Sequence, residues 1–376
     1  MSQRLLFIVN NLDFFISHRL EIGLAAIANG WQVKILGPAN TKAADILSDK
    51  GFDVQQLDVA KEDHSLLGQW RFLQAVYRTC RQFRPDLCHM ITLKTFLVAG
   101  VAARLARVPR RVGSVSGLGF FFISNEFKTR VSRILYRPLF HFAMANQATE
   151  VIFQNDDDRT VLLGYAGVDQ GQTHLIPGSG VDLARFSYQP EPSIPVVFLL
   201  IGRMLKDKGV LEFVEASRIL HEQGLNARFL LVGNPDKTNP ASLEQAQLEA
   251  WHEEGLIEWL GYCEDIPAII TSAHILVLPS YREGFPRVLI EAAASGRPSI
   301  TTDVPGCRDA IIPDQTGLLV PVCNSKALAK AMGYLAEDKP VRVEMGMKAR
   351  QLAEKKYAIE SVVSTHMKIY NLGNKG

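Results

Sequence analysis

Short apolar runs alternate with amphipathic segments along almost the whole chain, and this alternation constrains the fold more than any other feature. In the first half, the apolar runs cover residues 5–9, 33–36, 54–57, 87–91, 111–115 and 151–153. Between them, residues 17–29, 66–83 and 95–106 have the spacing of amphipathic helices. Strands that alternate with helices predict a doubly wound, mostly parallel sheet, which binds ligands beyond the carboxyl ends of its strands.

The alternation stops at residues 174–182 and begins again after a segment that contains Pro190, Pro192 and Pro195. Apolar runs at residues 196–201, 229–232, 257–260, 275–278 and 299–302 then predict a second sheet of the same kind. A chain of 376 residues is also long for one hydrophobic core. We therefore predict an α/β protein with two Rossmann-like, doubly wound domains that face a cleft. The predicted domains are residues 1–172 and 173–358, and a last helix within residues 359–376 can pack back onto the first.

Composition narrows the class of protein. Five cysteines, none in a CxxC pair, suit a reducing compartment, and no run approaches the roughly 18 apolar residues that a membrane span needs. The formal net charge is only +2, yet residues 71–137 hold 13 Lys or Arg and 2 Asp or Glu. This excess predicts an anionic partner, such as membrane headgroups or a phosphorylated acceptor, unless it is a solvated face. Nucleic acid is not predicted as a partner, because no recognised binding module accompanies the basic stretch.

The stretch from Ser280 to Glu291 is the strongest candidate for a binding site. It follows an apolar strand, turns at Gly284 and Pro286, and continues into a helix-forming segment. The first amides of a helix have no partner inside it, and the helix dipole favours an anion there. Glu283 and Glu291 flank this anion site and can bind hydroxyls, so the predicted guest is a nucleotide-sugar. The other residues expected to contact it are Gly284, Phe285, Pro286, Arg287 and Val288.

A second loop points to the same guest. Gly202 and Arg203 end the first strand of the second predicted domain, and Lys208 and Gly209 follow. Arg203 can bind phosphate oxygens bidentately, and Lys208 supplies a point charge. In a parallel sheet this loop and the 280–291 loop leave the same edge, so we expect both to contact the diphosphate of one donor.

These motifs resemble those of retaining glycosyltransferase family 4, which has the two-domain GT-B architecture. Arg203 and Lys208 match the Gly-Arg-x4-Lys-Gly pattern of that family, and Glu283 and Glu291 match its Glu-x7-Glu pattern. The resemblance implies that Arg203 and Lys208 contact the donor diphosphate, that Glu283 faces the donor sugar, and that Glu291 holds the ribose hydroxyls. It makes Glu283, Arg203 and Lys208 the expected catalytic residues.

Within the family the chain resembles bacterial enzymes that extend polyprenyl-diphosphate-linked saccharides for O-antigen, capsule or glycoprotein assembly. The resemblance implies metal-independent, retaining transfer of a hexose or N-acetylhexosamine from a UDP-sugar to a lipid-linked saccharide acceptor, without a cofactor. It also implies a cytoplasmic protein that is peripheral to the inner face of the cell membrane. Two other functions stay open: a nucleotide-sugar epimerase of the same fold, and a non-catalytic subunit that binds a nucleotide-sugar.

The first predicted domain departs from the family pattern at two positions. Residues 10–19, after the first strand, lack the Gly-Gly pair of many relatives, and Ser116 stands where many carry a His. The expected acceptor-side residues are Asn11, His18, Ser116 and Gly117. His18 is either a substitute for the missing His or a polar residue at a helix start. No general base is evident, so we expect the departing phosphate to take the proton of the acceptor.

An aromatic loop in the same domain has two interpretations. Residues 120–123 read Phe-Phe-Phe-Ile. Four cations follow within fifteen residues, namely Lys128, Arg130, Arg133 and Arg137. Exposed aromatic side chains beside cations suit a membrane interface that holds a lipid-linked acceptor, whereas buried ones belong to the core.

One acidic triplet has the Asp-x-Asp spacing that metal-dependent glycosyltransferases of another fold use. Asp156, Asp157 and Asp158 follow a predicted strand and begin a predicted helix. Helix capping and the helix dipole explain acidic residues at that place without a hard cation. We therefore predict no metal site.

Overall fold

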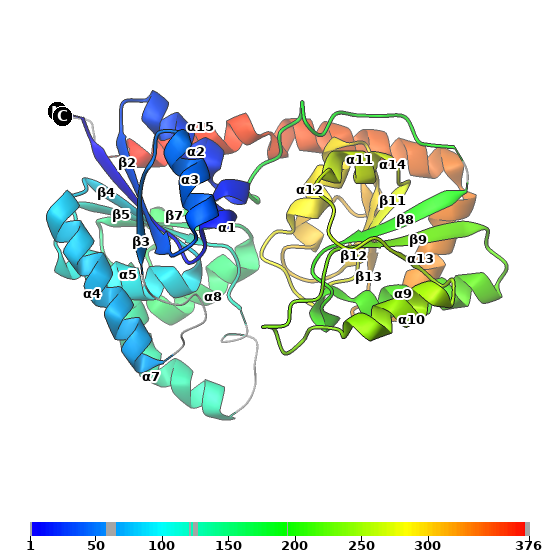
Figure 1. Cartoon of the computed structure of the whole chain (residues 1–376), viewed down its shortest axis with the longest axis horizontal. Coiled ribbons are helices and arrows are strands. Elements are labelled where there is room, and N and C mark those ends of the chain that lie inside the picture. The colour runs from blue at the N-terminus through cyan, green and yellow to red at the C-terminus, as the bar shows by residue number, and fades with distance from the viewer. Residues whose placement is uncertain (1, 58–64, 120–121, 123–126, 194, 373–376) are drawn as a thin grey trace. The chain divides into compact units, whose positions relative to one another are not determined.

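The computed structural model describes residues 2–57, 65–119, 122, 127–193 and 195–372, which form two compact units (Figure 1). One unit comprises Met1–Ser179 together with Glu360–Gly376, and the other comprises Gly180–Ile359. Each unit is built on its own parallel sheet with helices packed against it. The prediction of two Rossmann-like α/β domains is confirmed.

The sheet of the first unit has the strand order β3-β2-β1-β4-β5-β6-β7, and every pair of neighbours is parallel. Its strands are β1 (Arg4–Ile8), β2 (Gln32–Pro38), β3 (Asp53–Leu57), β4 (Leu87–Ile91), β5 (Arg110–Val115), β6 (Thr149–Phe153) and β7 (Thr173–Leu175). Residues along a strand point to alternate faces, so an all-apolar strand such as β1 is buried on both sides.

Helices cover both faces of this sheet. Leu6 and Ile8 of β1 belong to a core shared with α4 (Leu66–Phe83), α5 (Leu93–Leu105), α7 (Phe127–Met144) and α8 (Asp156–Ala166). Leu5 and Phe7 belong to a second core shared with α1 (Leu12–His18), α2 (Leu20–Ala28), α3 (Thr41–Asp49) and α15 (Ile359–Tyr370). The last helix thus packs against the first sheet, where the ring of Tyr370 is fully buried.

The sheet of the second unit has the strand order β10-β9-β8-β11-β12-β13, again with parallel neighbours. Its strands are β8 (Val196–Ile201), β9 (Ala227–Val232), β10 (Glu258–Trp259), β11 (Ile275–Leu278), β12 (Ser299–Thr302) and β13 (Gly317–Val320). One core faces α9 (Val210–Glu222), α10 (Gln245–Glu253), α13 (Ser325–Glu337) and α14 (Lys339–Leu352). The opposite core faces α11 (Ile266–Thr271), α12 (Arg287–Ala294) and the π-helical turn Ala353–Tyr357.

One expected domain boundary and one expected helix are wrong. The boundary between residues 172 and 173 would assign β7 to the second domain, but β7 pairs with β6, and the first unit extends to Ser179. The helix expected at residues 17–29 is two helices that meet at Arg19. The side chain of Asn11 caps α1, which therefore begins before Ser17, and the buried Arg19 leaves helical geometry with a φ of −134°.

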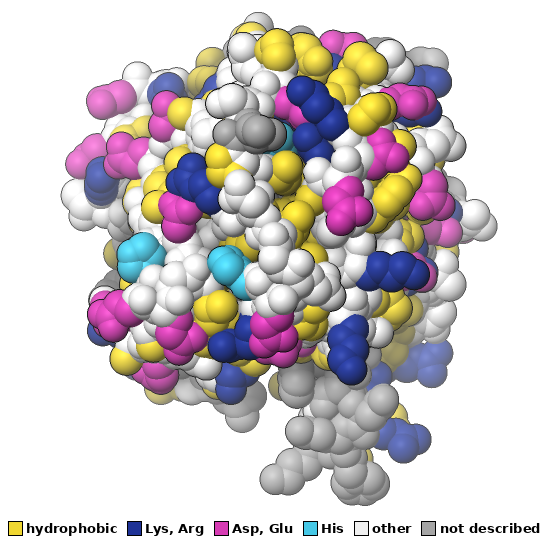
Figure 2. All heavy atoms as spheres, turned by 90° about the vertical axis from the view of Figure 1, so that its right-hand side faces the viewer, with side chains coloured by type: hydrophobic (Ala, Val, Ile, Leu, Met, Phe, Trp, Pro, Cys, Tyr) yellow, Lys and Arg dark blue, Asp and Glu magenta, His cyan; other side chains and the backbone are white. Residues whose placement is uncertain are grey.

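Charge is distributed differently in the two units. Figure 2 shows a face of the molecule on which Lys or Arg and Asp or Glu side chains lie next to one another, without a large patch of either sign. The basic excess of residues 71–137 falls entirely within the first unit, mainly on α4, α5 and α7. The anionic partner expected from that excess would therefore meet the first unit.

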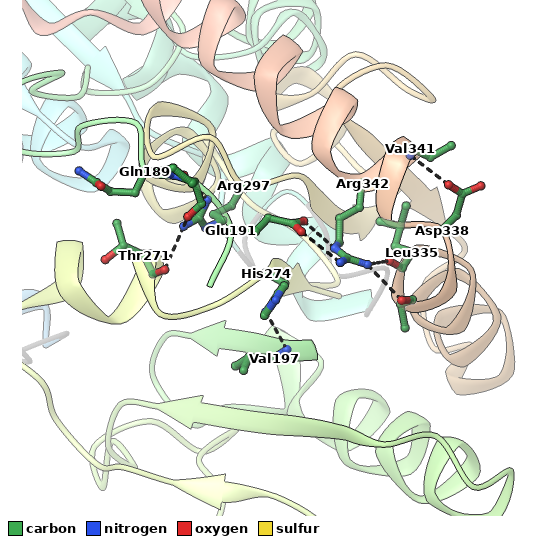
Figure 3. A network of polar contacts seen from close by, with 12 residues as sticks. Gln189, Glu191, Val197, Thr271, His274, Arg297, Leu335, Asp338, Val341 and Arg342 are labelled. Atoms are coloured by element: carbon green, nitrogen blue, oxygen red, sulfur yellow. Dashed lines mark hydrogen bonds and ion pairs between the residues drawn. The ribbon is translucent and has the colours of Figure 1, made fainter. Parts of the chain in front are cut away.

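Two buried arginines fasten the proline-containing segment before β8 to the second unit (Figure 3). The guanidinium of Arg297 donates to the carbonyl oxygens of Gln189 at 2.7 Å and Pro190 at 3.1 Å. Arg342 binds the carboxylate of Glu191 through two nitrogens, at 2.6 and 3.1 Å. This segment is therefore a built part of the second unit and not a free linker.

Candidate active site

The candidate site lies where the order of the strands reverses in the second sheet, between β8 and β11. β8 and β11 are neighbours, but the chain proceeds outward from β8 through β9 to β10, and from β11 through β12 to β13. The loops that follow β8 and β11 consequently diverge at the carboxyl ends of their strands, which is where open α/β sheets bind ligands. Residues 202–209 form the first loop, and residues 279–286 form the second.

The two loops pack closely against each other. The backbone amide of Tyr281 donates to the carbonyl oxygen of Asp207 at 2.9 Å. Gly209 has a φ of +72°, and a Cβ atom there would lie 2.2 Å from the carbonyl oxygen of Pro279. Only glycine fits this position, because it needs both the left-handed conformation and the absence of a side chain. The glycine thus lets Lys208 come next to the second loop.

Lys208 and Glu283 form an ion pair between the two loops. The hydroxyl of Ser280 donates to the same carboxylate oxygen of Glu283, at 2.8 Å. The side chains of Lys208 and Glu283 are 22% and 14% exposed, so the pair is partly shielded from water. A cation held in this way is preorganised to meet an anion that enters the loop region. The resemblance assigned these residues to different parts of the donor, and their direct contact was not predicted.

The loop after β12 packs against the turn at Glu283 and Gly284. Gly306, after β12, has a φ of +80°, and a Cβ atom there would lie 2.6 Å from the carbonyl oxygens of both residues. The hydroxyl of Thr302 donates to the carbonyl oxygen of Ser280. Cys307 is fully buried, and burial, together with the neighbouring Glu283 carboxylate, raises the pKa of its thiol to about 12. The thiol is therefore neutral at physiological pH and packs beneath the site.

The helix α12 begins directly after the second loop. Pro286 is its N-cap residue and makes no side-chain capping bond, and the amide of Leu289 donates to the carbonyl oxygen of Pro286 at 3.2 Å. The ring of Phe285 is turned into the core, where it meets the ring of Tyr357 edge to face at a centroid distance of 5.7 Å. Phe285 can therefore contribute its backbone, and not its side chain, to the binding of a donor.

Glu291 lies one turn into α12 and is only 8% exposed. Its carboxylate pairs with the Arg287 guanidinium at 2.7 Å. Burial raises the pKa of the Glu291 carboxyl, and the positive charges of Arg287 and Arg185 offset part of that rise. A buried carboxylate with one cationic partner is suited to accept hydrogen bonds from ligand hydroxyls.

Arg203 is placed differently from the other candidates. Its guanidinium binds the carboxylate of Asp236, after β9, at 2.8 Å, and its side chain is 59% exposed. Hydrogen bonds from the Thr238 hydroxyl and from Arg203 lower the pKa of Asp236. Among the described residues, no hydrogen bond or ion pair joins Arg203 to the Lys208–Glu283 pair. The neighbouring Gly202 lies against Gly233. A Cβ atom on Gly233 would lie 1.9 Å from the carbonyl oxygen of Gly202.

The acceptor-side candidates lie in the first unit: Asn11 follows β1, Ser116 and Gly117 follow β5, and His18 lies at the end of α1. Asn11 accepts a hydrogen bond from the amide of Asp13 at 2.9 Å, so its side chain is a helix cap. His18 is the last residue of α1, stacks on Phe14 at 4.1 Å and lies 2.7 Å from the Ser17 hydroxyl. The expectation that His18 stands at a helix start is therefore wrong. Ser116 and Gly117 directly follow β5.

Of the aromatic loop at residues 120–123, only Phe122 is among the described residues. Its ring meets those of Phe140 and Tyr165 edge to face, at centroid distances of 5.8 and 5.0 Å. For this residue the core interpretation is correct, and the membrane interpretation of its neighbours lies outside the described residues. The side chains of Arg130 and Arg137 on α7 are exposed.

The acidic triplet occupies the first turn of α8. Asn155 is the N-cap residue, and its side-chain oxygen accepts from the amide of Asp158 at 2.8 Å. Asp158 is fully buried and accepts from the Asn155 side-chain amide at 3.1 Å. Asp156 pairs with Arg159 one turn later. These contacts are those of a capped helix start.

Comparison with known proteins identifies the family. Residues 4–155 match the family model described as glycosyl transferase 4-like, and residues 195–338 match the model described as glycosyl transferases group 1. A Campylobacter jejuni protein, N,N'-diacetylbacillosaminyl-diphospho-undecaprenol alpha-1,3-N-acetylgalactosaminyltransferase, is 31% identical over 72% of this chain and 73% of its own length. The chain belongs to glycosyltransferase family 4. The recognition of this family from the Gly-Arg-x4-Lys-Gly and Glu-x7-Glu patterns is confirmed.

Other relatives agree with this assignment. An Escherichia coli protein, UDP-Gal:alpha-D-GlcNAc-diphosphoundecaprenol alpha-1,3-galactosyltransferase, is 27% identical over 74% of this glycosyltransferase and 73% of its own length. The solved structure of Anabaena Alr3699/HepE in complex with UDP superposes with a TM-score of 0.77 at 18% identity, covering 98% of this chain and all of that one. The structure of WaaG, a glycosyltransferase involved in lipopolysaccharide biosynthesis, gives a TM-score of 0.73 at 18% identity, with 99% and 100% coverage. The glycosyltransferase has the GT-B fold.

Among the described residues, no helix combines the length and the apolar character that crossing a bilayer requires. Within the same residues, no three His, Cys, Asp or Glu side chains are grouped so that they could hold a metal ion.

Proposed function

We propose that this glycosyltransferase transfers a hexose or N-acetylhexosamine from a UDP-sugar to a saccharide carried on a polyprenyl diphosphate, in bacterial polysaccharide or glycan assembly. The observation that carries the donor assignment is the Lys208–Glu283 ion pair, which lies at the switch point of the second sheet beside the start of α12. The positive charge and the helix amides suit the diphosphate, and the two glutamates suit hydroxyls on either side of it.

The names of two relatives support the acceptor class and the stereochemistry. The Campylobacter jejuni and Escherichia coli proteins are both named for substrates linked to undecaprenol through a diphosphate, and for alpha-1,3 transfer. The second name also specifies UDP-Gal as the donor. Because a UDP-hexose of this kind carries an α-linked sugar, an α-linked product means that the anomeric configuration is retained.

In the proposed reaction the bond between the anomeric carbon and the diphosphate breaks, and the acceptor hydroxyl forms the new bond on the same face. The proton of that hydroxyl passes to an oxygen of the departing phosphate, and UDP leaves with the bonding electrons. Negative charge grows on the diphosphate during this step. Lys208, the first amides of α12 and a relocated Arg203 would stabilise it, which is why we propose that no metal is needed.

The first unit offers a surface for a membrane-bound acceptor. Ile134 and Leu135 on α7 are 73% and 72% exposed, and Val131 and Leu139 on the same helix are also exposed. Arg130 and Arg137 are exposed on the same helix. A helix that presents large apolar side chains together with arginines suits the interface of an anionic bilayer. We propose that α7 places the enzyme at the inner face of the membrane, peripherally.

Changing Ile134 and Leu135 together to aspartate is expected to weaken binding to phosphatidylglycerol-containing vesicles at least about tenfold at low salt. Each change removes an apolar side chain from the interface and adds a charge that anionic headgroups repel. Val161→Asp, an exposed apolar position on α8, is the matched control and should bind like the wild type. Vesicle sedimentation measures the effect. Wild-type protein that stays in the supernatant at low salt would disprove the membrane contact.

A donor panel tests the function as a whole. The protein is incubated with UDP-GlcNAc, UDP-GalNAc, UDP-Glc, UDP-Gal or GDP-Man and bacterial membrane lipid extract, and the products are read by mass. One UDP-sugar should add one sugar to a diphosphate-linked lipid, also with EDTA present, and NMR of the product should show an α linkage. Conversion of a UDP-sugar to its epimer without acceptor would indicate an epimerase. UDP-sugar binding without any chemistry would indicate a binding subunit.

A further inference from the structure

A pocket of about 560 Å³ lies at the carboxyl edge of the first sheet. Its walls come from the loop after β1, the beginning of α5, the loop after β5, and one side each of α4 and α7. The side chains that line it include Leu93, Lys94, Leu97, Val98, Tyr136 and Phe140. β1 and β4 are the strands between which this sheet reverses its order, so the pocket occupies the ligand-binding position of the first unit. Its volume falls in the range of roughly 300–1,000 Å³ that small-molecule sites have.

The side chains that line the pocket indicate which class of ligand it can bind. Leu93, Leu118 and Phe140 are buried, while Leu97 and Val98 are half-buried, so most of the wall is hydrocarbon. A saccharide would leave its hydroxyls without hydrogen-bond partners against such a wall, which costs free energy for each hydroxyl. Lys94 is exposed in the first turn of α5, beside these apolar side chains. The combination fits an amphiphile with an apolar chain and an anionic head.

The two helices that contribute to the wall also carry exposed apolar side chains. Gln69 contributes to the wall from α4, and its neighbour Trp70 is 55% exposed. Tyr136 contributes from α7, and its neighbour Leu135 is 72% exposed. The pocket thus lies beside a helix, α7, that itself presents large apolar side chains to solvent.

We propose that this pocket receives the isoprene units next to the diphosphate of the acceptor, with Lys94 facing the diphosphate. The inference rests on the proposed function and extends it, because it assigns part of the lipid to a site inside the protein and not to the bilayer. It makes prenyl chain length a determinant of acceptor binding. Val98 and Leu97 contact the chain, and Lys94 binds the head group.

Binding of sugar-free prenyl diphosphates tests the pocket without any transfer. Isopentenyl, geranyl and farnesyl diphosphate are titrated into the protein by calorimetry, with saturating UDP present so that the second unit cannot bind them. Affinity should rise with chain length, at least about tenfold from isopentenyl to farnesyl, because each added unit buries apolar surface. Lys94→Met should weaken all three ligands by a similar factor and leave the dependence on chain length unchanged.

Filling or polarising the pocket should remove that dependence. Val98→Trp adds bulk, and Val98→Asn keeps the size but adds an amide that the chain cannot satisfy, so two variants guard against misfolding of either one. Leu105→Trp, at the exposed far end of α5, is the matched control and should behave like the wild type. Equal affinity of the wild type for isopentenyl and farnesyl diphosphate would overturn the proposal, as would wild-type chain dependence in folded Val98 variants. If the donor panel yields no transfer while chain-dependent binding persists, the proposed function fails and the pocket stands. Transfer in the donor panel together with equal affinity for isopentenyl and farnesyl diphosphate rejects the pocket alone.

Discussion

Replacing Lys208 with alanine is expected to lower kcat about 100- to 1,000-fold, with little change in the thermal unfolding midpoint. The size is that of losing one preorganised group that stabilises charge developing in a transition state. Lys208 meets this description because the loop contacts at Gly209 and Asp207 and the carboxylate of Glu283 hold it at the switch point. Steady-state kinetics with the UDP-sugar identified by the donor panel, together with the dissociation constant of UDP, measure the loss.

Lys206 supplies the matched control. It stands in the same 3-10 turn, Lys206–Lys208, but is exposed, so Lys206→Ala should keep kcat within about twofold of the wild type. Glu283→Ala should also lose most turnover, because the pair is a unit. The double variant should then be little worse than either single one. Near-normal activity of both Lys208→Ala and Glu283→Ala would remove the donor site from this position.

Replacing Glu191 with alanine is expected to lower the free energy of unfolding of the second unit by about 3–5 kcal/mol, the usual loss when one partner of a buried ion pair is removed. Arg342 is 2% exposed and Glu191 is 10% exposed, so the guanidinium left behind would be buried without a counter-ion. Arg342 also donates to the carbonyl oxygen of Leu335 at 2.6 Å, which keeps it from turning outward (Figure 3). Urea unfolding followed by tryptophan fluorescence reports the change, in a background where Trp31 and Trp70 of the first unit are replaced by phenylalanine so that only Trp251 and Trp259 of the second unit contribute.

Two further variants test whether burial of the Glu191–Arg342 ion pair causes the loss of unfolding free energy in Glu191→Ala. Glu344→Ala breaks the exposed pair with Lys348 and should change the free energy of unfolding by less than about 1 kcal/mol. Changing Glu191 to leucine and Arg342 to methionine together removes both charges, so it should recover part of the loss. Recovery should be incomplete, because the carbonyl oxygen of Leu335 also loses its donor. An effect of Glu191→Ala no larger than that of Glu344→Ala would show that the buried pair does not stabilise this unit.

Much of the fold follows from local pattern. The helix expected at residues 66–83 is α4 with the same bounds, and β1, β4, β8 and β11 coincide with buried apolar runs. Such strands are legible because both faces of a parallel sheet are covered, so nearly every residue is apolar. β7 was missed because three residues, Thr173–Leu175, carry little hydrophobic signal of their own. Its strand character comes from pairing with β6.

The residues of the candidate site could be predicted from the sequence for a similar reason. The glycines, the cations and the two glutamates stand in short loops after strands, where their spacing along the chain is informative by itself. The ion-pair partners of these residues could not be predicted from the sequence. Arg203 binds Asp236, Glu291 binds Arg287, and Lys208 binds Glu283, and the first and last of these pairs join loops that follow different strands. The signal that could have indicated the loop after β12 was Gly306, whose left-handed backbone is needed beneath the turn.

The sequence by itself determined the family, the two parallel sheets and the short motifs of the donor loops, because each depends on residues close together in the chain. Only the tertiary structure decided which charges meet, where the first unit ends, and that side chains from five separate segments enclose an apolar pocket. Those features depend on the order of strands within each sheet, which brings distant segments to one edge. Local propensity and spacing do not encode that order, because the same strands and helices are compatible with several arrangements.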